Sequence, residues 1–171
     1  MLKMTEHDHG FAQTLGLIAE LTPKKLLVLS SGVFQRLESA KPNCQVLLLD
    51  LASTPVERLA EQLNTLIQEI DLVLVTREIE ALDRTAARQV IGQLRNSLNA
   101  QILVLLSSSA PLDFSDMIGL GFKREASESS ATHDNNSMTL YTYDIANYNK
   151  KREWNNSRFW ANPENFDKFR W

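Results

Sequence analysis

The sequence predicts an α/β fold in which helices cover both faces of a mostly parallel sheet. Residues 71–109 indicate this most directly, because an apolar run at 72–75, a helical pattern and a second apolar run at 102–106 follow one another. Both runs are short, uninterrupted and rich in Val, Leu and Ile, as expected of strands buried on both faces. A helix of this length between two strands makes them parallel, with a right-handed connection.

Single residues mark the start and the end of the helix inside this unit. Asp83 is a predicted N-cap, and Asn99 tolerates the left-handed conformation in which many helices end. Apolar side chains recur between them at helical spacing on one face. They are Ala87, Val90, Ile91, Leu94 and Leu98.

The chain before this unit alternates in the same way, which predicts a three-layer sandwich. Either Ser30 or Ser31 can cap the second helix, and the third helix has a strong start signal. There, Thr54 lies at capping-box spacing before Glu57, with Pro55 at the first helical position, and the helix is expected to run directly into the strand at 72–75. The elements expected before Thr54 are a helix at 11–21, a strand at 26–29, a helix at 33–40 and a strand at 45–49.

After the fourth strand the sequence predicts a short helix and a terminal hairpin. Asp113 or Ser115 can start the helix. Residues 122–127 form a possible strand, and residues 138–145 alternate between apolar and polar side chains as a half-buried strand does. The simplest arrangement of these two strands is an antiparallel hairpin.

Composition and charge narrow the class of protein. The chain has 171 residues, of which 43% are hydrophobic and 23% charged, enough for one domain with a full core. Its net charge of −3 provides no strong attraction to nucleic acid or to a membrane surface. The first residues lack the pattern of a secretion signal, and the single cysteine, Cys44, fits a reducing compartment. We therefore expect a cytoplasmic protein that is not membrane-bound, with Cys44 packed rather than reactive.

Polar residues follow each of the four predicted parallel strands at its carboxyl end, where ligands bind in sheets of this kind. Two interpretations stay open. Hydroxyls and helix N-termini could form a ligand crevice, or the same residues could only supply the turns and caps that strand ends need. The residues are Ser30, Ser31, Gly32, Asp50, Thr76, Arg77, Glu78, Ser107, Ser108 and Ser109.

Several of these stretches have counterparts in a known family. Residues 26–34 read as a buried strand and a turn with one glycine, Asp50 follows the second strand, residues 71–82 form a strand and a helix start, and residues 121–123 lead into the last hairpin. In these features the chain resembles the class I S-adenosylmethionine-dependent methyltransferases, which have a Rossmann-like fold.

The resemblance covers roughly residues 20–145 and implies a fold, a cofactor and a site. It implies that the first strand lies between the second and the third, and that residues 1–145 form a Rossmann-like domain. It implies no particular catalytic residue. The residues that it assigns to S-adenosylmethionine are Ser30, Ser31, Gly32, Asp50, Thr76 and Arg77.

The chain departs from the family in its cofactor turn. The family has three glycines there, and the matching residues here are Ser30, Gly32 and Phe34; Val28 replaces an acidic residue within the first strand. The Phe34 ring could fill the adenosine pocket or point into the core. One strand and one helix are also expected to be missing between the second and third strands.

Three functions stay open, and the departures favour the first. It is a methyltransferase-like protein that has lost catalysis and acts as a binding or structural module. The second is an active S-adenosylmethionine-dependent methyltransferase with a divergent cofactor turn, and the third is a protein that binds another small anionic ligand at the strand ends.

Other candidate sites are weaker. His7 and His9 flank Asp8, but these residues make an incomplete ligand set, so no metal is predicted. Glu78 and Glu80 are expected to be the solvated start of a helix.

Residues 146–171 form a separate aromatic and basic extension. They carry six basic and three acidic residues, a net charge of +3 that leaves −6 for the rest of the chain. An extension so rich in aromatic residues is predicted to dock on its own domain, with contact to a partner protein or a second copy as the alternative and nucleic acid as a weaker one. It resembles the ends of small uncharacterised bacterial proteins. All three tryptophans of the chain lie in it, at Trp154, Trp160 and Trp171.

Overall fold

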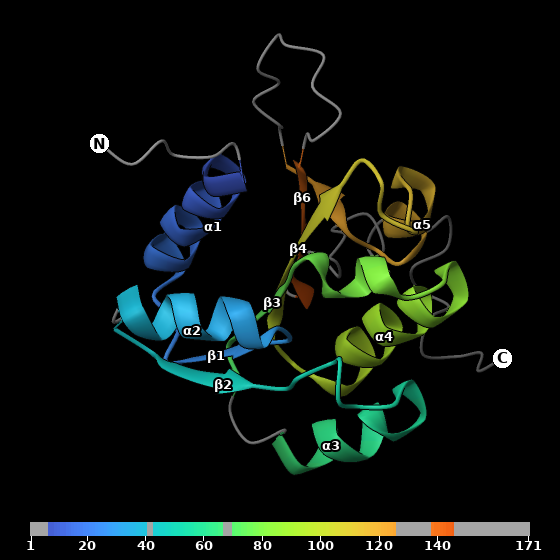
Figure 1. Ribbon diagram of the computed structural model, residues 1–171, viewed down its shortest axis with the longest axis horizontal. Helices are drawn as coiled ribbons and strands as arrows, with labels where there is room; N and C mark the ends of the chain where they lie inside the picture. The colour runs from blue at the N-terminus through green and yellow to red at the C-terminus, as the bar shows by residue number, and fades with distance from the viewer. Residues whose placement is uncertain (1–6, 41–42, 67–69, 126–137, 146–171) are drawn as a thin grey trace, which may run out of the picture.

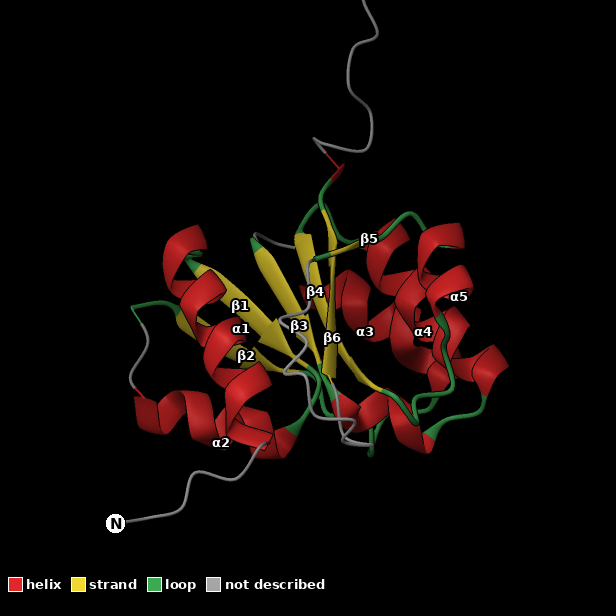
Figure 2. Ribbon diagram, turned by 90° about the horizontal axis from the view of Figure 1, so that it is seen from above, coloured by secondary structure: helices red, strands yellow, loops and turns green. Residues whose placement is uncertain are grey.

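Helices cover both faces of one six-stranded sheet, so the chain folds as a three-layer Rossmann-like sandwich (Figure 2). The computed structural model describes residues 7–40, 43–66, 70–125 and 138–145. The elements are α1 His7–Leu21, β1 Lys25–Val28, α2 Ser31–Ala40, β2 Gln45–Leu48, the 3-10 helix η1 Val56–Arg58, α3 Leu59–Leu66, β3 Leu72–Val75, the 3-10 helix η2 Arg77–Ala81, α4 Arg84–Ser97, β4 Gln101–Ser107, α5 Phe114–Gly119, β5 Lys123–Arg124 and β6 Met138–Tyr143.

The strands lie in the order β2-β1-β3-β4-β6-β5 (Figure 1). The first four are parallel, whereas β6 pairs antiparallel with both β4 and β5. The predicted fold class, the antiparallel end of the sheet and the position of the first strand between the second and the third are all confirmed. Between β2 and β3, the described residues contain only η1 and α3.

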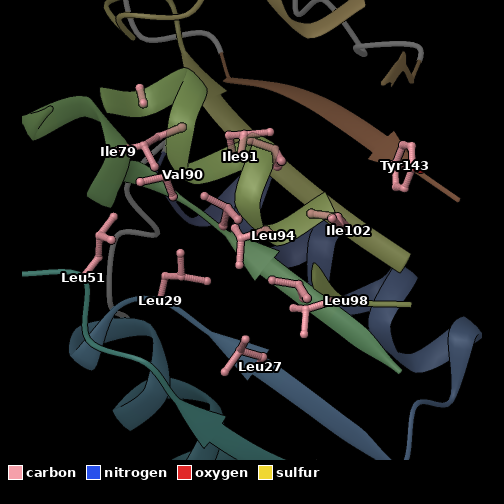
Figure 3. Packing of buried hydrophobic residues seen from close by; sticks show 14 of the residues in the cluster. Leu27, Leu29, Leu51, Ile79, Val90, Ile91, Leu94, Leu98, Ile102 and Tyr143 are labelled. Carbon is pink, nitrogen blue, oxygen red and sulfur yellow. The ribbon is translucent and has the colours of Figure 1, made fainter. Parts of the chain in front are cut away.

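The sheet separates two hydrophobic clusters because side chains alternate between the faces of a strand. In β1 and just after it, Leu27 and Leu29 face the cluster under α3, α4 and α5, while Leu26 and Val28 face the cluster under α1 and α2. Figure 3 shows the first cluster, in which buried side chains of α4 such as Leu94 contact the strands. All four residues of β3 are buried, as predicted for a strand covered on both faces.

The start of α4 is as predicted, but its end is not. The side chain of Asp83 accepts a hydrogen bond from the N–H of Ala86 at 2.9 Å, so Asp83 is the N-cap. The helix ends at Ser97, and Leu98 is the extended C-cap, with φ −109°. Leu98 is buried, and extending the chain there places its side chain in the core. The predicted left-handed end at Asn99 is therefore wrong.

The predicted capping box at Thr54 is also wrong. The Thr54 side chain is buried, and its hydroxyl donates to Oε1 of Gln62 at 3.0 Å instead of accepting from a first-turn N–H. Pro55 is the N-cap of η1 without a side-chain hydrogen bond. The chain therefore makes a tight 3-10 turn before α3, and α3 ends at Leu66 rather than running into β3.

Other boundaries shift by a few residues, as is usual at helix and strand ends. α1 begins at His7 rather than at residue 11, and β5 is shorter than the predicted strand at 122–127. α1 is followed by Thr22, which has φ 44° and donates its N–H to the carbonyl of Ile18.

Candidate functional site

The candidate site is the edge of the sheet at which the four parallel strands end. The turns that follow β1, β2, β3 and β4 all lie along this edge, because parallel strands end on the same side of a sheet. Every residue that the sequence assigned to the site lies at a strand end, in one of these turns or at the start of the helix that follows. The contacts of these residues differ strongly from one turn to the next.

The turn after β3 is closed by Thr76 and Glu78. The backbone N–H of Thr76 donates to Oε2 of Glu78 at 2.8 Å, and its hydroxyl donates to Oε1 at 2.6 Å. Thr76 is buried, so its polar groups need partners within the protein. The two residues satisfy each other, and the prediction that Glu78 is only a solvated helix start is wrong.

Glu80 joins the end of β3 to the end of β4. Its Oε2 lies 3.3 Å from Nε of Arg77, and its Oε1 accepts a hydrogen bond from the N–H of Ser107 at 3.2 Å. Only 14% of the Glu80 side chain is exposed, so it is not the solvated residue that was predicted. Sequence reasoning missed this contact because Glu80 and Ser107 are 27 residues apart.

The turn after β4 is stabilised by its own hydroxyls. The Oγ atoms of Ser107 and Ser109 lie 2.8 Å apart, and Ser107 Oγ accepts from the N–H of Ser109 at 3.3 Å. Ser107 is buried, whereas Ser108 and Ser109 are exposed. These serines therefore supply a turn at a strand end, which is the second of the two interpretations that the sequence left open.

The turn after β1 leads directly into α2. Ser30 is the cap of this helix, since its Oγ lies 3.4 Å from the N–H of Val33 and its carbonyl accepts from the N–H of Phe34 at 2.9 Å. Ser31 and Gly32 are exposed in the first turn of α2. A Cβ atom on Gly32 would meet only Ser30 Oγ, at 3.7 Å, which is an ordinary van der Waals contact and not a clash.

Phe34 belongs to the core. Its ring packs against the cluster under α1 and α2, which includes Leu26, Val28 and Leu37. Of the two positions left open for this ring, the structure therefore has the one in the core.

The turn after β2 contains Asp50, which is half-buried. Its Oδ1 accepts from the N–H of Ala52 at 3.2 Å, and its carbonyl accepts from both the N–H and the hydroxyl of Ser53. The N–H of Leu51 donates to the carbonyl of Leu29 at 3.1 Å, which holds this turn beside β1. Within the described part of the chain, Oδ2 of Asp50 accepts no hydrogen bond.

A second polar cluster ties α4 to α5; Asp113 starts α5, as one of the two predicted positions, but its contact with Arg84 was missed from the sequence. Asp113 and Asp116 form a capping box at the start of α5, and Nη2 of Arg84 lies 2.9 Å from Oδ2 of each carboxylate. The N–H of Asp116, and then the charge of Arg84, lower the pKa of Asp113. Because the pKa of Asp113 is lower in the folded protein than in the unfolded chain, the interactions of its carboxylate stabilise the fold at pH values above the unfolded-state pKa. This stabilisation is lost as the pH falls through the lower folded-state pKa.

The remaining predicted features give no further site among the residues that the structure describes. Cys44 packs against the cluster under α1 and α2, and burial raises the pKa of its thiol. No three potential metal ligands gather in the described ranges, and no helix there is long and apolar enough to cross a membrane. The side chains of residues 7–9 and all of residues 146–171 lie outside the described part, so the predicted docking of the extension stays a prediction.

The chain is similar to several solved structures at low sequence identity. The PH0226 protein from Pyrococcus horikoshii OT3 is 12% identical, with a TM-score of 0.51, and the match covers 83% of this chain and 92% of that one. The magnesium protoporphyrin IX methyltransferase (ChlM) from Synechocystis PCC 6803, solved with bound SAM, is 12% identical, with a TM-score of 0.48 and coverage of 78% of each chain. An O-methyltransferase family protein from Burkholderia thailandensis is 10% identical, with a TM-score of 0.49 and coverage of 78% of this chain.

These matches differ in how much of the other protein they cover. The chain spans 55% of the length of the Burkholderia thailandensis protein and 56% of the length of a structure from Nostoc punctiforme. No curated protein matches the sequence of this chain. A family model, that of DUF6231, a family of unknown function, matches residues 9–171, and the chain therefore belongs to that family.

Proposed function

We propose that this protein is a methyltransferase-like module that has lost catalysis and acts by binding or by structural support. The observation that carries the proposal is the closed turn after β3, in which Thr76 donates to both carboxylate oxygens of Glu78. A carboxylate whose two oxygens are occupied by its own turn is a poor candidate for moving a proton or orienting a ligand. Arg77 is likewise engaged with Glu80.

The turn after β1 fits the cofactor poorly. Glycines in such a turn let the backbone approach a nucleotide closely. Here, two of the three positions that the resemblance identifies serve the fold of the chain itself, because Ser30 caps α2 and Phe34 packs into the core. Loss of those glycines supports a protein that no longer transfers methyl groups.

Two observations favour a second candidate, an active S-adenosylmethionine-dependent methyltransferase with a divergent turn. Asp50 keeps one carboxylate oxygen without a hydrogen bond among the described residues, and a carboxylate at this position suits ribose hydroxyls. Gly32 is exposed, and a Cβ atom there would touch only Ser30 Oγ, so the described residues do not block the close approach of a cofactor. Asp50 would hold the ribose hydroxyls, and the backbone at Gly32 would face the cofactor.

Binding of another small anion is the weakest of the three candidates. The carboxylates of Asp50, Glu78 and Glu80 lie along the strand ends, and the positive charge of Arg77 is already paired with Glu80. An anion entering there would meet more negative than positive charge, which costs free energy.

A thermal-shift titration with S-adenosylmethionine and with its demethylated product tests the proposal. A ligand present at 100 times its dissociation constant stabilises a protein by about 2.7 kcal/mol, and we expect no such shift here. The Asp50→Ala variant is titrated with the same two ligands for comparison with wild type. If wild type is stabilised and Asp50→Ala is not, the second candidate takes the place of the proposal.

The module would meet a partner through residues 146–171 if this extension does not cover its own domain. We propose that the extension does cover its own domain, because the aromatic side chains of the segment carry a large apolar area. Deleting residues 154–171 should then lower the melting temperature markedly. If the shortened protein melts where the full chain does, the segment is an arm, and a pull-down with the isolated segment is the next measurement.

A further inference from the structure

The strand β2 forms one edge of the sheet, and nothing in the described part of the chain pairs with its outer side. Figure 1 shows β2 at the margin of the sheet, between α2 and α3. The two helices leave the strand uncovered, since Gln45 is exposed and Leu48 is 38% exposed.

The hydrogen bonds to β1 show which backbone groups of β2 face outward. The N–H of Gln45 donates to the carbonyl of Lys24 at 2.8 Å, and the N–H of Leu49 donates to the carbonyl of Val28 at 2.9 Å. Because successive residues of a strand direct their backbone groups to opposite sides, Val46 and Leu48 direct theirs away from β1. The open edge therefore presents two N–H groups and two carbonyls.

Apart from its short length of four residues, the β2 edge lacks the features by which proteins usually prevent strand pairing. Such edges carry charged side chains, proline or a bulge. Residues 44–49 contain no charged residue and no proline, and the β1–β2 register continues without a bulge from Lys25 opposite Gln45 to Val28 opposite Leu48.

We propose that this edge is an interface with a second copy of the chain, in which β2 pairs antiparallel with β2 of the partner. A two-fold axis at Leu47 places Val46 opposite Leu48 of the partner subunit, and each such pair exchanges both of its hydrogen bonds. All the outward backbone groups are then used, in about four hydrogen bonds. Leu48 gains an apolar contact across the interface.

The sequence of the strand suits a second copy rather than another occupant. In this register the only charged residue near the axis, Asp50, lies opposite Cys44 of the partner subunit, so no like charges face each other. Pairing across such an axis joins the two sheets into one continuous sheet and removes the open β2 edge of each copy. The central paired residues 46–48 are not candidate ligand residues, and the interface meets the candidate ligand site only at Asp50.

Sedimentation of the full chain tests the interface. Wild type should be a dimer, and Leu48→Lys should weaken its dimerisation at least about tenfold by placing a charge at the interface, a loss of about 1.4 kcal/mol. Ile118→Lys is the matched control, because Ile118 is 45% exposed on α5, at the other end of the sheet. It should leave the dimer unchanged. A monomeric wild type, or a Leu48→Lys protein that dimerises like wild type, would overturn the proposal.

Two further variants keep the test decisive if Leu48→Lys fails to fold. Leu48→Pro removes an outward N–H without removing a bond to β1, so it should fold and be monomeric. Leu47→Cys, made together with Cys44→Ser, should form a disulfide-linked dimer on oxidation, since the two introduced thiols face each other at the axis with Cα atoms about 4.5 Å apart. A folded Leu48→Pro dimer, or no cross-link at residue 47, contradicts the pairing.

Discussion

The turns after β3 and β4 differ from those after β1 and β2, although all four lie at one edge of the sheet. In the first pair, the polar groups of Thr76, Glu80 and Ser107 are bonded to one another or to neighbouring residues, and two of these residues are buried. In the second pair, Gly32 is exposed and Asp50 keeps an oxygen without a partner among the described residues. The buried polar groups of the first pair therefore stabilise the fold, whereas the second pair keeps an unpaired carboxylate oxygen at Asp50 among the described residues.

The largest expected effect of a substitution is at Glu80. Glu80→Ala leaves the N–H of Ser107 and the guanidinium of Arg77 without this carboxylate, and should lower the free energy of unfolding by about 1–3 kcal/mol. Urea denaturation measures this loss in the free energy of unfolding. Glu80→Gln keeps an acceptor for Ser107 and should cost less than Glu80→Ala. Equal and negligible losses in both variants would mean that the first pair of turns does not depend on this contact.

A smaller loss is expected at Thr76. Thr76→Val keeps the shape of the side chain but removes the hydroxyl that donates to Glu78, which should cost about 1 kcal/mol. Thr76→Ser keeps the hydroxyl and is the control for that bond. If the valine variant unfolds at the urea concentration of wild type, the closed turn contributes nothing to stability.

Asp50 should matter less for stability than either residue of the first pair. Asp50→Ala removes one exposed hydrogen bond to Ala52, so the free energy of unfolding should change by no more than about 1 kcal/mol. The same denaturation measurement checks it. A larger loss would place Asp50 with Glu80 and Thr76 as a residue that stabilises the fold.

Gly32 gives the smallest effect, with the opposite sign. Gly32→Ala adds a Cβ in the first turn of α2 that meets only Ser30 Oγ, at the van der Waals distance of 3.7 Å. It should stabilise the protein by about 0.5 kcal/mol because alanine loses less backbone freedom on folding. Gly92→Ala is a matched control, since Gly92 lies in helix α4 and a Cβ atom there would meet nothing within 4 Å. A destabilised Gly32→Ala protein with a stabilised Gly92→Ala protein would show that something in the fold needs this glycine.

Local patterns predicted the framework of the fold well. The apolar run at residues 72–75 is β3 with the same bounds, and Asp83 caps α4, because burial on both faces and helix capping each depend on a few neighbouring residues. Thr54 shows where this reasoning fails. Its spacing from Glu57 fits a capping box, but Pro55 is the N-cap of the 3-10 turn that follows, and the Thr54 hydroxyl donates to Gln62, eight residues further on.

The candidate site was predicted by position but not by contact. Parallel strands have to end at a common edge, so the strand ends could be identified from the sequence. The bond between Glu80 and Ser107 joins residues from different turns, and no local pattern indicates it. The position of the Phe34 ring also depended on packing between α2 and the sheet, which periodicity alone left open.

The contact between α1 and β6 has a consequence for synthesis of the protein. Leu15 and Leu17 of α1 pack against a cluster that includes Leu140 of β6. The ribosome makes α1 long before β6, and at 5–20 residues per second the delay is on the order of 10 s. During that time the apolar side of this helix lacks part of its final binding surface. Chaperones that capture exposed apolar segments of nascent chains are therefore expected to bind α1 until β6 has been synthesised.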